Sequence, residues 1–159
     1  MKSLVESILG DQDDILKTAE TAQVKSNAQF NNDVQLAIRY VKKYIENTGI
    51  AFRWAPGYGD VIESAYLNTT KPNHIMVFQN VCAHMEKAFN GCVKKLKCKY
   101  EIETSKNSRH IKYEIENSRY TYIGPKLVIY NGDDPYVVIA VTAMPPRRIE
   151  INFPKLTLR

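Results

Sequence analysis

The sequence of 159 residues lacks any long hydrophobic run. Its longest apolar stretch, residues 136–141, is far shorter than the roughly 18 residues that a membrane-spanning helix needs, and it predicts a buried strand instead. The first residues also lack the features of a secretory signal, because Glu6 interrupts the apolar segment and no small-residue cleavage site follows. We therefore expect a chain that stays in a cytoplasmic compartment or within a virion assembled there.

Cysteine is scarce, with three residues, an odd number, clustered at Cys82, Cys92 and Cys98. This is not the pattern of a disulfide framework. None of the possible zinc ligands has the short C-x2-C or H-x3-H spacing of a structural zinc site, so we expect no metal. These possible ligands are His74, Cys82, His84, Cys92, Cys98 and His110.

Enzyme motifs are also absent, since the chain contains neither a G-x-S-x-G nor an H-E-x-x-H sequence. The PGYGD segment at residues 56–60 resembles a phosphate-binding turn, but it lacks the Gly-Lys-Ser/Thr ending of a P-loop. Asp133 and Asp134 could bind a hard cation, yet their NGDDP context is typical of a hairpin turn. We predict no catalytic residue and no cofactor, and therefore a protein that is not an enzyme.

Two segments have a clear helical period. Apolar residues line one face of residues 33–49, where Asp33 is placed to cap the start of a helix and Gly49 to end it. The longest helical pattern covers about residues 74–96, and its last turn is rich in lysine, which suits the helix dipole. Its apolar positions are Phe78, Val81, Cys82, Met85, Ala88, Phe89, Cys92, Val93 and Leu96.

The segment between these two helices predicts two short elements. Residues 50–54 predict a strand. Asp60 and Glu63 have the spacing of a capping box, which predicts a short helix that ends near residue 67.

The period changes from 3.6 to 2 near residue 98. The sequence KYEIE occurs twice, at residues 99–103 and 112–116, and predicts two strands paired with each other through a turn near 104–109. Every charged cross-strand pair is complementary if Glu101 lies opposite Lys112. In this arrangement Tyr100, Ile102, Tyr113 and Ile115 face the core, and the lysines and glutamates face solvent.

Three further strands are predicted at residues 120–130, 136–142 and 149–153, the first of them broken at Gly124 and Pro125. The fold class is therefore α+β, with N-terminal helices and one long helix (about 74–96) packed on a C-terminal antiparallel β-meander. We assign residues 1–30 to an amphipathic arm and connector, and residues 31–159 to a single α+β domain.

The net charge of +5 is unevenly distributed, with −2 in residues 1–70 and +7 in residues 71–159. A basic half favours a polyanionic partner, and tyrosines between the basic residues could stack on bases. The alternative is a tyrosine-rich core beneath a solvated charged face. The candidate nucleic-acid-binding residues are Lys94, Lys95, Lys97, Lys99, Arg109, Arg119, Arg147 and Arg148.

The first nine residues, MKSLVESIL, have the apolar stripe of a short amphipathic helix. Such a short helix is marginal alone in water, so its stripe must dock on a partner or pack on the chain's own core. The segment resembles the opening of uncharacterised proteins from gut Bacteroides and from their tailed phages, including crAss-like phages. It is also similar to capsid-targeting peptides of internal phage head proteins. The candidate partner-docking residues are Leu4, Val5, Ile8 and Leu9.

Together these patterns and the resemblance lead to a functional hypothesis. We expect a non-enzymatic phage or phage-like structural or interaction protein, whose N-terminal helix docks on a protein partner and whose basic domain contacts protein or nucleic acid, as in a virion. The alternative is a cytosolic nucleic-acid-binding module, whose affinity would fall steeply with salt.

Overall fold

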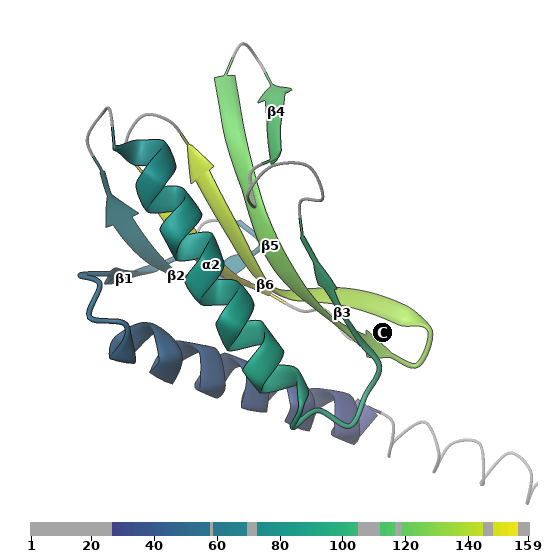
Figure 1. Cartoon of the computed structure of the whole chain (residues 1–159). Helices are drawn as coiled ribbons and strands as arrows, with labels where there is room; N and C mark the ends of the chain where they lie inside the picture. Colours follow the sequence, from purple (N-terminus) through teal and green to yellow (C-terminus); the bar gives the residue numbers. More distant parts are fainter. Residues whose placement is uncertain are drawn as a thin grey trace, which may run out of the picture.

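The computed structural model describes residues 27–57, 59–69, 73–104, 112–116, 119–144 and 148–155, and its fold is α+β. Residues 27–47 form a helix, and the second helix, α2, covers His74–Val93. The strands are β1 (Arg53–Pro56), β2 (Val61–Asn68), β3 (Tyr100–Glu103), β4 (Lys112–Glu116), β5 (Arg119–Asn131), β6 (Asp134–Met144) and β7 (Arg148–Pro154). They form a seven-stranded antiparallel sheet in the order β1-β2-β7-β6-β5-β3, with β4 also paired to β5. Both helices pack on the same face of this sheet (Figure 1).

The helix of residues 27–47 is amphipathic, as its sequence predicts. Its buried residues recur three or four positions apart, which gives one apolar face toward the sheet. They are Phe30, Val34, Ala37, Val41 and Ile45. Gly49 follows the helix with a φ of +74°, the left-handed conformation expected of a glycine that ends a helix.

The predicted role of Asp33 as the cap of this helix is wrong. The helix already includes residue 27, so Asp33 lies inside it rather than at its start. Its side chain is buried, and it accepts hydrogen bonds from the segment that follows α2. The sequence defines the start of this helix only weakly, because several polar residues between positions 26 and 33 could each serve as its N-cap.

Helix α2 confirms the long helix, which lies across the sheet in Figure 1. Eight of the nine predicted apolar residues, from Phe78 to Val93, are buried, and Leu96 is half-buried beyond the helix end. Each large side chain buried in this way stabilises the fold by about 1.5–3 kcal/mol. The predicted end at residue 96 is wrong, since α2 ends at Val93 with Lys94 as its C-cap, and the lysines that follow lie in a turn.

The predicted helix near residues 60–67 is also wrong, because these residues form β2. β2 pairs with β1 on one side and with β7 on the other, and it places Ala65 in the core. Strands on both sides satisfy the backbone N–H and C=O groups of β2 with hydrogen bonds. This pairing outweighs the capping-box spacing of Asp60 and Glu63, which predicted a helix. The predicted strand at residues 50–54 lies at Arg53–Pro56. The sheet therefore contains two strands that precede α2 in the chain, and it is not only a C-terminal meander.

Strands β5, β6 and β7 form the predicted antiparallel meander. The expected hairpin turn joins Asn131 to Asp134, and Gly132 in this turn has a φ of +62°. The expected break in β5 is a shift of register between Ile123 and Lys126. At this break Gly124 lies beneath α2, where an added Cβ would come within 2.8 Å of the Cys82 sulfur.

The predicted pairing of the two KYEIE copies is wrong. Both copies are strands, but each pairs with β5: Tyr100 lies opposite Ile129, and Lys112 lies opposite Ile123. With 13 residues, β5 is long enough to receive both copies one after the other along the same edge.

Two charged side chains of the first KYEIE copy, Lys99 and Glu101, contact Tyr130 rather than the charged residues of the second copy. The Tyr130 hydroxyl donates a hydrogen bond to the Glu101 carboxylate at 2.9 Å, and the Lys99 ammonium lies 4.5 Å from the centre of the Tyr130 ring. Tyr100 was predicted to face the core, but it is 46% exposed. Ile102 packs against the core as predicted, and the side chains of Tyr113 and Ile115 lie outside the described residues.

Candidate functional site

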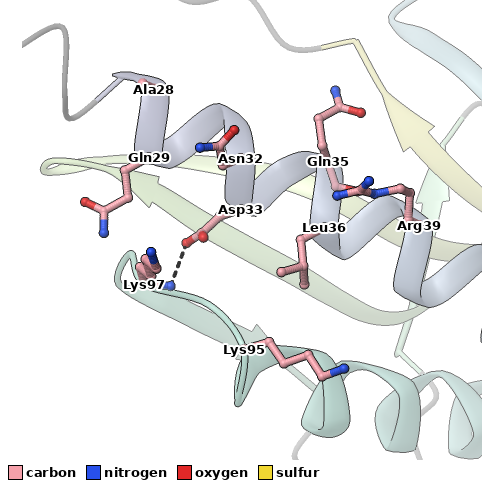
Figure 2. Close-up of a pocket in the computed structure, with 9 residues that line it drawn as sticks. All are labelled: Ala28, Gln29, Asn32, Asp33, Gln35, Leu36, Arg39, Lys95 and Lys97. Carbon is pink, nitrogen blue, oxygen red and sulfur yellow. Dashed lines mark hydrogen bonds between the residues drawn. The ribbon is translucent and has the colours of Figure 1, made fainter.

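A cleft of about 550 Å³ opens between the helix of residues 27–47 and the turn that follows α2 (Figure 2). Seven of its lining residues come from the helix, and two come from the turn. They are Ala28, Gln29, Asn32, Asp33, Gln35, Leu36, Arg39, Lys95 and Lys97. The cleft therefore joins two segments that are about 60 residues apart in the chain.

Asp33 holds the two walls of the cleft together. One oxygen of its carboxylate, Oδ2, accepts hydrogen bonds from the backbone N–H groups of Lys97 at 3.0 Å and Cys98 at 2.7 Å. Asp33 is only 3% exposed, so these bonds compensate the loss of solvation of its carboxylate. The turn itself is closed by backbone hydrogen bonds from Lys95 to Cys92 and from Leu96 to Val93. The position of Lys95 and Lys97 opposite the helix is thereby fixed.

The charged side chains that line the cleft are three cations and one carboxylate. Arg39 is exposed, and its Nε donates to the carbonyl oxygen of Gln35 at 3.3 Å. Lys95 and Lys97 are exposed on the opposite wall, and the Lys95 ammonium lies 5.3 Å from the centre of the Tyr40 ring. Because the Asp33 carboxylate is buried and engaged by two N–H groups, the solvent-facing charge of the cleft is positive.

The remaining polar groups of the cleft are side-chain amides. Gln29 and Asn32 are exposed and lie one helical turn apart, and Gln35 follows on the same helix. Leu36 adds an apolar surface on the side of the helix that faces Lys95, whereas Gln35 points away from it (Figure 2). Amides carry both a donor and acceptors, so this wall can form hydrogen bonds with a wide range of polar ligands.

The structure brings only part of the predicted basic set together. Lys94, Lys95, Lys97 and Lys99 are all exposed, but Lys95 and Lys97 alone among them line the cleft. Arg148 does not line it. Its guanidinium lies 4.1 Å from the centre of the Tyr66 ring and forms an ion pair with Glu150.

The other predicted residues cannot be placed at this site. Arg109 and Arg147 lie outside the described residues, as do the candidate docking residues Leu4, Val5, Ile8 and Leu9. The backbone of Arg119 pairs with Glu116 between β4 and β5, and its side chain is outside the described part of the structure.

Sequence reasoning missed Arg39, Gln29 and Asn32. Their signal is the polar side of the helix of residues 27–47, where amides and cations outnumber carboxylates. This signal could not be connected with Lys95 and Lys97, because only the tertiary fold brings the two segments together.

The three thiols are poor nucleophiles at neutral pH. Burial raises the pKa of the Cys82 thiol to about 12, with a smaller contribution from Glu86. Burial, followed by the charge of Asp33, raises the pKa of Cys92 to about 11. Burial, followed by a hydrogen bond to Asp33, raises the pKa of Cys98 to about 11. In the described ranges, no group of three or more His, Cys, Asp or Glu side chains could hold a metal ion.

Comparisons with known proteins give no relative: no family model, no curated protein and no solved structure matches the chain. Neither helix of the described residues is sufficiently long and apolar to cross a membrane.

Proposed function

We propose that this protein is a non-enzymatic interaction protein whose α+β domain binds the phosphate backbone of a nucleic acid in the basic cleft. The observation that carries this proposal is the convergence of Arg39, Lys95 and Lys97 from two separate segments on one cleft. Lysine and arginine bind phosphates through charge-assisted hydrogen bonds, and the counterions that they displace favour association.

Two properties of the cleft support a polyanion over an acidic small molecule. The three cations line an open surface cleft rather than an enclosed cavity, so a chain can pass through it. The described segment around them contains further exposed lysines, Lys94 and Lys99, which extend the positive charge beyond the cleft. An extended positive surface raises the local concentration of a polymeric anion.

We further propose the phage-like setting, in which the N-terminal stripe of Leu4, Val5, Ile8 and Leu9 docks on a protein partner. Its support is the amphipathic pattern of residues 1–9 and the resemblance of that segment to phage and Bacteroides proteins. Deletion of residues 1–10 should leave the melting temperature of the domain nearly unchanged. A large fall would instead place the stripe in the domain's own core. The alternative, a cytosolic nucleic-acid-binding module, is marked by an affinity that falls steeply with salt.

The binding of nucleic acid can be tested with fluorescently labelled oligonucleotides and anisotropy at low salt. The wild-type chain should bind, and K95A/K97A should bind at least tenfold more weakly, since two phosphate contacts are lost. The matched control is K87A/K155A, which removes the same charge from exposed lysines that do not line the cleft. Absence of binding by the wild-type chain, or equal losses in the two variants, would refute the proposal.

A further inference from the structure

We propose that β3 is an interaction surface for a second copy of this chain, with the two β3 strands paired antiparallel about a two-fold axis at Tyr100. The proposal does not depend on the nucleic-acid-binding cleft, because Tyr100 and its neighbours Lys99 and Glu101 do not line it. β3 lies at the end of the sheet opposite β1 (Figure 1). Among the residues that the structure describes, β3 pairs with β5 alone, so its outer edge has no neighbouring strand.

The outer edge of β3 presents backbone groups that can form hydrogen bonds. The carbonyl oxygen of Lys99 accepts the Tyr130 N–H at 2.8 Å, so the backbone of Lys99 faces β5. Because this direction alternates along an antiparallel strand, Glu101 also faces β5, whereas Tyr100 and Ile102 direct their N–H and C=O groups outward. Such groups are a template for the addition of another strand.

The opposite end of the sheet is protected against strand addition. The Gly57 N–H donates a hydrogen bond to β2, so the same alternation directs the backbone of Trp54 and Pro56 outward from β1. Pro56 has no N–H, and the N–H of Phe52, just before the strand, donates to the carbonyl oxygen of Ile50 at 2.8 Å. Proline is a common protection of edge strands. β3 contains no proline, so it is the edge that can receive a strand.

The charges of β3 favour a second copy of the chain in one register. A two-fold axis perpendicular to the sheet brings residues of the same face opposite each other, so it can pass at Tyr100, Glu101 or Ile102. An axis at Tyr100 places each Lys99 opposite the partner's Glu101. An axis at Glu101 would bring the two Glu101 carboxylates together, although Lys99 would meet the partner's Glu103, and an axis at Ile102 would bring Glu101 to the partner's Glu103. Opposite charges stabilise cross-strand pairs and like charges destabilise them, which selects the axis at Tyr100.

The charged side chains are well placed for these contacts. Lys99 and Glu101 are exposed, and both contact Tyr130, so they share one face of the sheet. Their backbones face β5, and the partner's strand would therefore meet them at the closely spaced positions of an antiparallel pair. Opposite Cα atoms at such positions are about 4.5 Å apart, which brings the side chains together.

Tyr100 supplies the apolar part of the contact. It is one of the exposed large hydrophobic residues of the structure, and at the axis its ring would lie beside the ring of the partner's Tyr100. Cross-strand aromatic pairs stabilise a sheet, and the backbone N–H and C=O groups of the two tyrosines would form two hydrogen bonds. A contact between two short strands is small, so we expect a weak dimer whose population rises with protein concentration.

Sedimentation velocity of the full chain at low salt, from about 10 μM to about 1 mM, measures this self-association. The wild-type chain should form dimers within this range. K99E would place carboxylates opposite each other, and E101K would place ammonium groups opposite each other, so each should weaken association by about tenfold or more. K99E/E101K exchanges the two charges and should recover the wild-type association. An equimolar mixture of K99E and E101K should recover it too, as a heterodimer in which every charged pair is complementary.

K87E and E46K are the matched controls, because each reverses one exposed charge on a helix rather than on β3, and both should associate like the wild-type chain. The melting temperature of each variant shows whether it is folded, since E101K also removes the hydrogen bond from Tyr130. Recovery in the mixture is independent of this loss, because both single variants keep their own substitution.

The outcomes separate this proposal from the function proposed for the cleft. A wild-type chain that stays monomeric up to about 1 mM refutes the dimer. Dimerisation that K99E and E101K leave unchanged places the contact elsewhere and also refutes it. Weakening by both single variants without recovery in K99E/E101K or in the mixture overturns the axis at Tyr100. Oligonucleotide binding tests the cleft, and its failure would leave the dimer unaffected.

Discussion

The carboxylate of Asp33 accepts the backbone N–H of Cys98 at 2.7 Å, across 65 residues of sequence. The same oxygen accepts the N–H of Lys97, so one buried side chain fixes the turn that carries two cations of the cleft. D33A should lower the free energy of unfolding by about 1–3 kcal/mol, because two part-buried backbone N–H groups would lose their acceptor. Urea denaturation measures this change. E46A, an exposed carboxylate of the same helix, serves as the control and should change stability by less than about 0.5 kcal/mol.

Asp33 also controls the Cys98 thiol. Burial raises the pKa of Cys98 to about 11, and the hydrogen bond and negative charge of Asp33 add to this rise because they favour the neutral thiol over the thiolate. The alkylation rate of Cys98 should therefore be low at pH 8 and should increase toward pH 11. In D33N this increase should move to lower pH, since the charge is removed. Mass spectrometry after timed iodoacetamide treatment resolves Cys98 from the other thiols, and fast alkylation of the wild-type residue at pH 8 would contradict the account.

Gly124 tests the contact between α2 and β5. A Cβ at this position would lie 2.8 Å from the Cys82 sulfur and 3.1 Å from the Val141 Cβ, which is too close for ordinary packing. G124A should therefore destabilise the domain by about 1–3 kcal/mol. The double variant G124A/C82A removes the sulfur and should recover part of this loss relative to C82A alone. Additive effects of the two substitutions would show that Gly124 and Cys82 are not in contact.

The periodic segments explain why part of this fold could be predicted. In α2 the apolar residues Phe78, Met85 and Phe89 recur at helical spacing, and burial against a sheet requires only such a stripe. The meander was predictable for a similar reason, since Gly132 lies in a turn sequence between two apolar runs. These features depend on residues that are close together in the chain.

The failures concern features that depend on distant residues. β2 is a strand because β1 and β7 lie on either side of it, and no local signal reports that environment. Charge complementarity allows the two KYEIE copies to pair with each other, but in the structure both copies pair with the long strand β5 instead. For the same reason the cleft was only half predicted: the lysines at 95 and 97 were identified as a basic cluster, and Arg39 was not connected with them.

The hydrogen bond from Tyr130 to Glu101 gives a direct test of the β3–β5 pairing. Glu101 raises the pKa of the Tyr130 hydroxyl above its ordinary value, first by accepting its hydrogen bond and then by its charge, both of which disfavour the phenolate. E101Q should therefore lower the pKa of Tyr130, as followed by NMR of the ring carbons. E103Q is a matched control with a smaller expected shift, because Glu103 contributes only its charge. A Tyr130 pKa that E101Q leaves unchanged would contradict the pairing of the first KYEIE copy with β5.

The salt dependence of oligonucleotide binding shows whether the cations of the cleft bind phosphates. If Arg39, Lys95 and Lys97 each contact one phosphate, a plot of log K against log salt should have a slope of about −2 for a single strand or about −3 for a duplex, and R39A/K95A/K97A should bring that slope close to zero. A wild-type slope near zero, or the same slope in the triple variant, would contradict the assignment of the cleft as the nucleic-acid-binding site.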